Sequence, residues 1–278
     1  MSIVKHCVLP VAGYGTRFLP ASKSIPKEMF PVLNKPLIHF SIEEAFECGI
    51  KNFTVVTNKH KEAIKHYLKE GSHTDDFLQS VSKQKLLSDL NKLLMQISVN
   101  FRYQESMTGL GHAISLARKS FLNEPFAVIL PDDLCFNRDK SVLHQMIQIH
   151  EMYPDHCIVA VEKVPSESVS SYGIVDATMT VIDKVYEIKD MVEKPAIDKA
   201  PSDLAIIGRY ILSYNIFDTL DMVEPDHNGE IQITNALKIL AKEGKVLAYE
   251  FEGTRYDCGS ISGYVSANYD FSKLNNML

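Results

Sequence analysis

The residues best suited to bind a phosphate group cluster near the amino terminus, between positions 11 and 29. Gly13 and Gly15 allow the backbone to approach a ligand closely, and Arg17 and Lys27 supply cationic donors beside the same loop. The pattern is not a dinucleotide-binding fingerprint, because a phenylalanine stands where the third small residue is required, and no Gly-Lys-Ser/Thr of a P-loop follows. The spacing therefore predicts a phosphate-binding loop of a different kind.

Two adjacent carboxylates, Asp132 and Asp133, follow the apolar run Phe126–Leu130. If that run is a strand, both side chains lie at its carboxyl end, where open α/β sheets bind their ligands. Carboxylate oxygens suit Mg²⁺, which is usually held by one or two carboxylates together with substrate phosphates. For such an Asp pair taken alone, a turn or a helix cap is the structural alternative.

Polar residues at two further strand ends could bind the organic parts of a ligand. Gln104 and Gly109 follow one predicted strand, and an amide that both donates and accepts, next to a glycine, could read the edge of a base. Glu193 and Lys194 end another predicted strand at Pro195, so a carboxylate for sugar hydroxyls lies beside a cation for a phosphate. Taken alone, each pair could instead be structural or a solvated strand end.

Strands that alternate with helices must position these residues. The apolar run Ile3–Val11 leads into the glycine loop, which is typical of a buried parallel strand. A helix with Pro36 in its first turn is predicted, with apolar residues at helical spacing and Gly49 as its stop. Further strands are predicted at 53–56, 97–103 and 126–130, and further helical stretches from His60, near 75–95 and from Gly109. This alternation implies a mostly parallel sheet, covered on both faces, in a doubly wound α/β fold.

After Cys157 the pattern changes to shorter β-rich segments with fewer helices between them. These segments suggest a mixed extension of the sheet rather than a separate domain, because no Gly/Ser/Pro-rich linker divides the halves. Helices are expected over residues 230–243 and 261–274. We therefore predict one domain, residues 1–278, made of a nucleotide-binding lobe at about 1–156, a β-rich lobe at 157–260 and a carboxyl-terminal helix at 261–278.

The composition excludes several classes of protein. Of the 278 residues 45% are hydrophobic and 23% charged, and 29 basic against 35 acidic residues give a net charge of −6. An acidic balance argues against binding to nucleic acid or to a membrane surface. The sequence holds no apolar segment typical of a signal peptide or a membrane span, and its five cysteines have neither zinc nor disulfide spacing. We expect a cytoplasmic protein with no membrane partner.

Several motifs together resemble one known family. The run AGYGTRFLPASKSIPKEMFPVLNKPLI, residues 12–38, resembles the opening of the bacterial sugar-nucleotide pyrophosphorylases, in the branch that uses UTP and glucose-1-phosphate. Further matching pieces follow in the family's order: YQESMTGLGHA (103–113), LPDDL (130–134), SYG (171–173), VEKP (192–195), IGRY (207–210), EIQIT (230–234) and YDCG (256–259). Because independent motifs in one order are more specific than any single motif, the resemblance extends over nearly the whole chain.

The resemblance implies a role for each candidate residue. It makes Arg17, Lys27 and Lys194 the catalytic residues that act on the phosphates. It makes Asp132 the metal-binding aspartate, with Asp257 as its partner across the site. The implied nucleotide-binding residues are Ala12, Gly13, Gly15, Thr16, Glu28, Gln104, Gly109 and Asp133, the last near the ribose or sugar, and the implied sugar-binding residues are Gly173, Glu193 and Lys194.

The resemblance also implies a fold and a reaction. The expected fold is a Rossmann-like, doubly wound mixed sheet of the nucleotidyltransferase, glycosyltransferase-A-like type, with a β-rich sugar-binding lobe. The expected activity is the Mg²⁺-assisted synthesis of UDP-glucose and pyrophosphate from UTP and glucose-1-phosphate, in a homodimer or homotetramer. The same chemistry with dTTP or another hexose-1-phosphate is one alternative, and a non-catalytic subunit that binds a nucleotide sugar is another.

Overall fold

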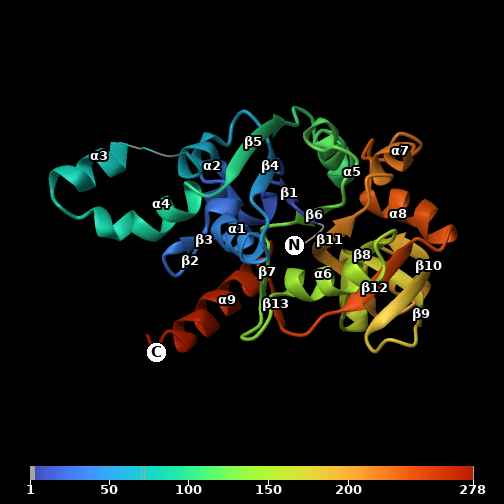
Figure 1. Cartoon of the computed structure of the whole chain (residues 1–278). Helices are drawn as coiled ribbons and strands as arrows, with labels where there is room; N and C mark the ends of the chain where they lie inside the picture. Colours follow the sequence, from blue (N-terminus) through green and yellow to red (C-terminus); the bar gives the residue numbers. More distant parts are fainter. Residues whose placement is uncertain (1–3, 70, 72, 278) are drawn as a thin grey trace.

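A nine-stranded mixed β-sheet forms the centre of the molecule (Figure 1). The computed structural model describes residues 4–69, 71 and 73–277. The strands of this sheet are β1 (His6–Pro10), β4 (Asn52–Thr57), β5 (Ser98–Tyr103), β6 (Phe126–Ile129), β8 (Cys157–Lys163), β9 (Gly173–Met179), β10 (Val185–Glu193), β11 (Leu204–Leu212) and β12 (Val246–Glu250). Their order across the sheet is β5-β4-β1-β6-β11-β8-β12-β10-β9.

The first four strands in this order are parallel. β1 pairs with β4 on one side and with β6 on the other, and β4 pairs with β5. Their carboxyl ends therefore meet at one edge of the sheet, where the loops after β1 and β6 lie next to each other. β11 enters beside β6 in the opposite direction. From there on the sheet is mixed, since β12 is parallel to β8 while β9 and β10 pair antiparallel.

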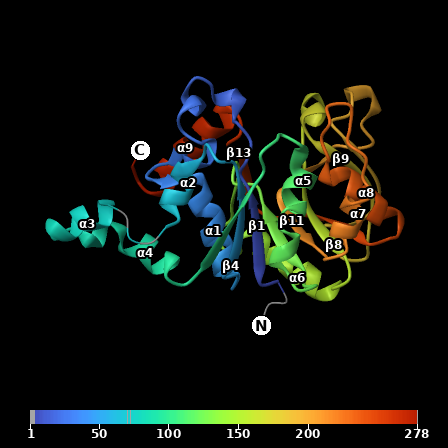
Figure 2. The ribbon, with the colours of Figure 1, turned by 90° about the horizontal axis from the view of Figure 1, so that it is seen from above.

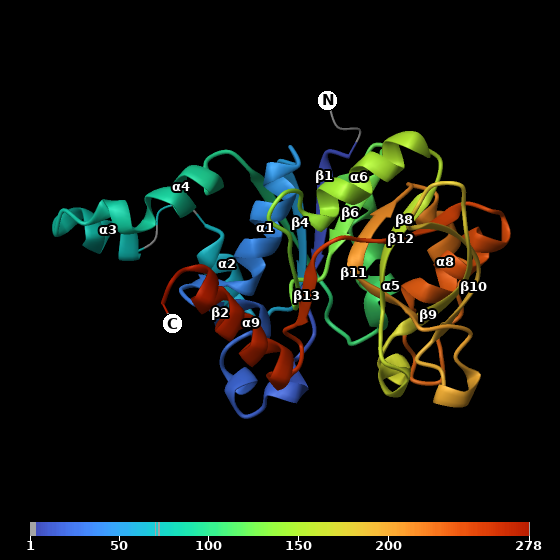
Figure 3. The same ribbon diagram turned by 90° about the horizontal axis from the view of Figure 1, so that it is seen from below.

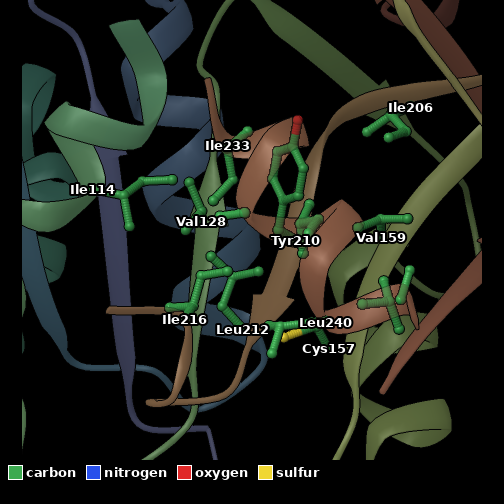
Figure 4. Packing of buried hydrophobic residues seen from close by; sticks show 14 of the residues in the cluster. Ile114, Val128, Cys157, Val159, Ile206, Tyr210, Leu212, Ile216, Ile233 and Leu240 are labelled. Atoms are coloured by element: carbon green, nitrogen blue, oxygen red, sulfur yellow. The ribbon is translucent and has the colours of Figure 1, made fainter. Parts of the chain in front are cut away.

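Helices cover both faces of the sheet (Figures 2 and 3). One face carries α1 (Leu37–Glu47), α2 (Glu62–Tyr67), α4 (Ser88–Leu94) and α6 (Val142–Met152), and the other carries α5 (Gly109–Ser115), α7 (Ile216–Leu220) and α8 (Ile233–Lys242). Successive side chains of a strand point to opposite faces, so Val8 packs in the core below α5, while Cys7 and Leu9 pack in the core below α1. Figure 4 shows the first of these cores, in which Ile114 and Ile216 lie against the sheet near Val128.

A small antiparallel sheet ties the carboxyl-terminal segment to the loop after β6. It consists of β7 (Asp133–Phe136) and β13 (Thr254–Asp257), with Asp257 opposite Asp133. α9 (Ile261–Leu274) follows and packs Ala267 and Phe271 into a third apolar cluster. A further small sheet joins β2 (Pro31–Val32) and β3 (Lys35–Pro36) within the same region. This arrangement brings residues from both ends of the chain to one edge of the main sheet.

The observed architecture agrees with the predicted doubly wound mixed sheet and its β-rich second half. The helical stretch predicted near 75–95 is interrupted, since it divides into α3 (His73–Ser80), a 3₁₀ turn η4 (Gln84–Leu87) and α4, with Ser82 at a φ of 56°. α3 and α4 project from one side of the molecule (Figure 1). Across the described residues, every helix is too short or too polar to span a bilayer.

Three other elements differ from the sequence-based expectations. The helix expected over 230–243 begins only at Ile233, because the preceding backbone runs along the start of α5, where Gly111 N–H donates to the Ile231 carbonyl at 2.8 Å. α6 was not among the predicted helices. The strand expected from Ile3 begins at His6, and Ile3 lies outside the described residues. The division into lobes near residues 156 and 260 stays a prediction.

A buried ion pair crosses the core near the edge of the sheet where the loops gather. Arg209 on β11 is 1% exposed, and its Nη2 lies 2.8 Å from Glu44 Oε2 on α1. The other oxygen of Glu44 accepts from the N–H of Leu143, at the first turn of α6. Arg209 Nη1 also donates to the carbonyls of Leu130 and Gly208. The pair thus connects α1 and α6 with the end of β6 and the middle of β11, next to the loop that carries Asp132.

Candidate active site

Two adjoining hollows open at the carboxyl edge of the parallel strands. The first has a volume of about 270 Å³ and lies towards the β-rich half. The second has a volume of about 370 Å³ and lies between the loops that follow β1 and β5. Asp132 and Lys194 line both hollows. A ligand that filled the two hollows would therefore pass these two side chains at its centre.

The second hollow brings together residues that the sequence predicts to bind the nucleotide. Ala12, Gly13, Glu28, Gln104 and Gly109 all line it, although they come from three separate segments. Gly109 has a φ of +89°, and a Cβ there would lie 2.6 Å from a backbone carbonyl oxygen of the neighbouring segment. Only glycine fits this position, because the backbone of Ile231 packs directly against the start of α5.

Gly15 and Thr16, also predicted to contact the nucleotide, do not line either hollow. Gly15 has a φ of +64° and lies against Lys27, whose Cβ would be 3.2 Å from a Cβ at the glycine. Thr16 begins a 3₁₀ turn, η1 (Thr16–Phe18). Both residues shape the loop that carries the cations, and their direct contact with a nucleotide stays a prediction.

The first hollow contains the residues predicted to bind a sugar. Glu193 ends β10, and its Oε2 accepts a hydrogen bond of 2.7 Å from Thr234 Oγ1. Gly173 faces the same carboxylate, so closely that a Cβ would lie 3.2 Å from Glu193 Oε2. A carboxylate beside a stretch of backbone without a side chain is suited to bind hydroxyl groups.

An ion pair occupies the centre of the site. Lys27 Nζ lies 2.5 Å from Asp132 Oδ2, and the two side chains are only 18% and 19% exposed. Burial alone would raise the pKa of the Asp132 carboxyl, but the adjacent Lys27 ammonium outweighs it, so that pKa is lowered. Burial alone would lower the pKa of Lys27, but the nearby carboxylates, chiefly that of Asp132, outweigh it, so the pKa of Lys27 is raised. Both groups are therefore charged at neutral pH.

Asp257 faces Asp132 across a small space next to Gly259. A Cβ at Gly259 would lie 2.8 Å from Asp132 Oδ2 and 2.9 Å from Asp257 Oδ1, so the two oxygens border the same space. Arg17 reaches it too, with Nη1 3.8 Å from Asp257 Oδ2. Within the part of the chain that the structure describes, three or more acidic, His or Cys side chains nowhere gather into a metal cluster. Two carboxylates alone fit Mg²⁺, which takes its remaining ligands from water and phosphates.

Lys194 lies where the two hollows meet and has an unusual backbone conformation. Its φ is 45°, which residues other than glycine rarely adopt. Its N–H donates to the Tyr172 carbonyl at 2.9 Å, which holds this backbone in place. The side chain is 58% exposed, with Nζ 3.5 Å from Glu193 Oε1. The ammonium is thus available to an anion, and a strained residue at a hollow points to function.

Comparison with known proteins identifies the family. Residues 7–273 match the family described as nucleotidyl transferase. The chain belongs to the nucleotidyl transferase family. It is similar to a UTP–glucose-1-phosphate uridylyltransferase of Pseudomonas aeruginosa, with 44% identity over 275 residues and coverage of 98% of each chain.

Solved structures of nucleotidyl transferases share the same fold. A crystal structure of UDP-glucose pyrophosphorylase complexed with UDP-glucose matches with a TM-score of 0.87 at 45% identity, over 97% of this chain and 99% of that chain. A UTP-bound UGPase from Acinetobacter baumannii matches with a TM-score of 0.87 at 36% identity, over 97% and 93% of the two chains. The family and the fold class predicted from the motifs are both confirmed.

In this nucleotidyl transferase, Asp133 has protein donors on both carboxylate oxygens. Its Oδ1 accepts from Arg255 Nε at 2.7 Å, and its Oδ2 accepts from the Gly208 N–H at 2.6 Å. A Cβ at Gly208 would lie 2.7 Å from the same Oδ2, so the strand must carry a glycine there. Asp133 therefore fastens its loop to β11 and β13, and its predicted contact with the ribose or sugar stays a prediction.

Arg255 is a residue of the site that sequence reasoning missed. Its guanidinium also lies 2.6 Å from Glu162 Oε1 and 5.0 Å from the centre of the Tyr172 ring. The sequence could have indicated this residue, because Arg255 stands two positions before Asp257 in a strand. Alternate residues of a strand point to the same face, so Arg255 is expected on the face that carries Asp257. The arginine thus forms part of the wall of the first hollow.

Lys61 is another residue that sequence reasoning missed, and it accounts for the burial of Glu28. Glu28 is 1% exposed, and Lys61 Nζ lies 2.8 Å and 3.0 Å from its two oxygens. Burial raises the pKa of Glu28 and lowers that of Lys61, so each group depends on the other to remain charged. Because Lys61 lies 33 positions away from its partner, no local pattern indicates the pair.

Proposed function

We propose that the chain catalyses the reaction of UTP with glucose-1-phosphate to give UDP-glucose and pyrophosphate. The observation that carries the proposal is the meeting of the two hollows at Asp132 and Lys194, with Lys27 beside them. A nucleotide in the second hollow and a sugar phosphate in the first would bring their phosphates together at these charges. Relatives at 44% and 38% identity over nearly the full chain, named UTP–glucose-1-phosphate uridylyltransferase, support this assignment.

The proposed chemistry needs no general base. The phosphate of the sugar has a second pKa of about 6, so its oxygen is largely ionised at neutral pH. That oxygen attacks the α-phosphorus of UTP, the bond from this phosphorus to the bridging oxygen breaks, and pyrophosphate leaves with the electron pair. Lys27, in the second hollow, and Arg17, in the first, would neutralise the growing charge, and Lys194, which lines both, would hold the phosphate of the sugar.

Asp132 and Asp257 are our proposed ligands for Mg²⁺. When bound, the ion would neutralise negative charge on the phosphates during the displacement. Lys27 keeps the Asp132 carboxylate ionised and fixes its orientation through Oδ2. The small space beside Gly259, which a larger side chain would fill, supports this pair of ligands.

The remaining predicted contacts belong to the same proposal. Ala12, Gly13, Gln104 and Gly109 would receive the base in the second hollow, with Glu28 nearby. In the first hollow, Glu193 would hold the hexose, and the backbone at Gly173 would contact the sugar. We further propose that the protein works in the cytoplasm as a homodimer or homotetramer.

The decisive test is pyrophosphate release in the presence of Mg²⁺. UTP, dTTP, ATP, CTP and GTP are each combined with glucose-1-phosphate and with several other hexose-1-phosphates. The highest kcat/KM is expected for UTP with glucose-1-phosphate, and dTTP is expected to follow, because one methyl group changes binding by only about 1–3 kcal/mol. A higher kcat/KM for another pair of substrates would support the proposed type of reaction but would contradict the assignment of UTP and glucose-1-phosphate. Stabilisation by UDP-glucose without any release of pyrophosphate would instead identify a non-catalytic binding subunit.

Replacing Lys194 should change the KM values of the two substrates to different extents. Lys194→Ala is expected to raise the KM for glucose-1-phosphate more than the KM for UTP, because the ammonium lies next to the sugar-binding Glu193. Steady-state kinetics with each substrate varied in turn measures this split. Lys199→Ala removes an exposed lysine five positions further on and serves as the matched control. An equal rise in both KM values would contradict the role given to Lys194.

A further inference from the structure

The side-chain amide of Gln104 has a fixed orientation in the second hollow. Gln104 is 6% exposed, and its Nε2 lies 3.1 Å from the Gly109 carbonyl oxygen, 3.1 Å from His112 Nδ1 and 3.3 Å from Thr108 Oγ1. A backbone carbonyl can only accept, so the atom of the amide that faces Gly109 must be the nitrogen. With the ring proton of His112 on Nε2, His112 Nδ1 accepts as well, and the nitrogen then has more acceptors around it than protons to donate.

The amide oxygen is consequently the atom left for a ligand. Among the residues that the structure describes, none donates a hydrogen bond to Gln104 Oε1. This oxygen is also not one of the buried polar atoms that lack a hydrogen-bond partner, so it is accessible to a ligand. Gln104 lines the second hollow. At this point the hollow is therefore lined by a hydrogen-bond acceptor, Gln104 Oε1, while the amide nitrogen is hydrogen-bonded to the protein.

The Thr108 hydroxyl, from the residue before α5, and His112 Nδ1, from within α5, complete the set of acceptors. Thr108 Oγ1 makes a short hydrogen bond with His112 Nδ1, so the hydroxyl and the ring support each other. The backbone of this turn is itself fixed, because Ile231 N–H donates to the Thr108 carbonyl and its own carbonyl accepts from Gly111 N–H, each at 2.8 Å. His112, a half-buried residue with no assigned role in the transfer reaction, is therefore held against Gln104.

We propose that His112 is a positioning residue for base selection, which acts by holding the Gln104 amide with its oxygen towards the ligand. The proposal rests on the proposed function and deepens it. Uracil and thymine carry a donor at N3, whereas cytosine presents an acceptor there with an amino group beside it. An amide oxygen facing N3 accepts from the first two bases and is repelled by the third. If the amide turned over, its nitrogen would favour cytosine, so the orientation of Gln104 sets the choice of base.

The test compares His112→Ala with His112→Asn. Alanine removes the acceptor, whereas an asparagine oxygen can take the place of Nδ1 and still accept from Gln104. Dissociation constants for UTP and CTP are measured by calorimetry, and kcat/KM is measured for both nucleotides with glucose-1-phosphate. His112→Ala is expected to lower the UTP preference over CTP about tenfold, with His112→Asn close to the parent protein. His144→Ala, an exposed histidine on α6, is the matched control and should leave the preference unchanged.

A second pair of variants tests whether His112 acts through Gln104. In Gln104→Leu no amide remains to be oriented, so adding His112→Ala should leave the UTP to CTP ratio unchanged. A further fall in the ratio in the double variant would show that His112 acts by another route and would overturn the proposal. Equal losses for both nucleotides in His112→Ala would also overturn it, because a merely structural residue would weaken both alike.

The binding measurements keep this inference separate from the proposed reaction. If the parent protein releases no pyrophosphate but its UTP preference falls in His112→Ala, the proposed function fails and the inference stands. If the parent protein turns over UTP but binds UTP and CTP equally well, the proposed function stands and the inference fails.

Discussion

The Asp132→Asn variant is expected to turn over UTP and glucose-1-phosphate about 100-fold more slowly than the parent protein, or slower still. The substitution removes one charge while keeping the shape of the side chain. That charge is the partner of Lys27 and one of the two carboxylates assigned to Mg²⁺. The neutral amide would leave the Lys27 ammonium without its counterion and the ion with a weaker ligand, where negative charge builds in the transition state. Initial rates of pyrophosphate release measure the effect.

The control for this variant is Asp139→Asn, which removes a carboxylate from the exposed loop that follows β7. Its turnover should match that of the parent protein. Rates are compared at Mg²⁺ concentrations high enough to saturate both proteins, so that weaker metal binding does not hide the effect on the chemical step. Unchanged turnover of Asp132→Asn at saturating Mg²⁺ would remove Asp132 from the proposed mechanism.

The sequence predicts the central elements of the fold well, for a physical reason. β1 and β6 are nearly uninterrupted apolar runs, as strands buried on both faces must be, and α9 has the bounds expected from its pattern. The region of α3 and α4 is predicted less well, because α3 buries only Leu78 and α4 packs into the core mainly through its last turn, so few packing contacts mark where the helices begin and end. The pairing of β7 with β13 joins residues more than a hundred positions apart, and no local pattern encodes it.

The candidate site is likewise predicted only in part from the sequence. Strand ends and a resemblance to a family single out Asp132, Glu193 and Lys194, and the structure brings all three to the first hollow, while their roles stay a prediction. The partners of site residues could not be read from the chain, since Gly208 donates to Asp133 from 75 positions away and Arg255 from 122 positions away. Such contacts follow from the topology of the mixed sheet, which the order of the elements alone does not determine.

The Arg209→Met variant is expected to lower the free energy of unfolding by about 3–5 kcal/mol, the usual cost of breaking a buried ion pair by removing one partner. Glu44 is 8% exposed, and without the guanidinium its carboxylate would be left in the core facing an apolar side chain. The carbonyls of Leu130 and Gly208 would also lose a donor. Urea unfolding curves measure the change, and Arg138→Met, at an exposed position, is the matched control.

The double variant Glu44→Leu/Arg209→Met distinguishes a structural pair from a positioning one. Two apolar side chains remove the uncompensated charge, so the double variant should be clearly more stable than Arg209→Met alone. A single variant as stable as the Arg138→Met control would show that the pair does not hold the core together. Arg209 also donates to the carbonyls of Leu130 and Gly208, which adjoin the loop of Asp132 and Asp133, so recovered stability with reduced turnover would show that the pair positions the catalytic loop. If turnover recovered as well, the pair would contribute to folding alone.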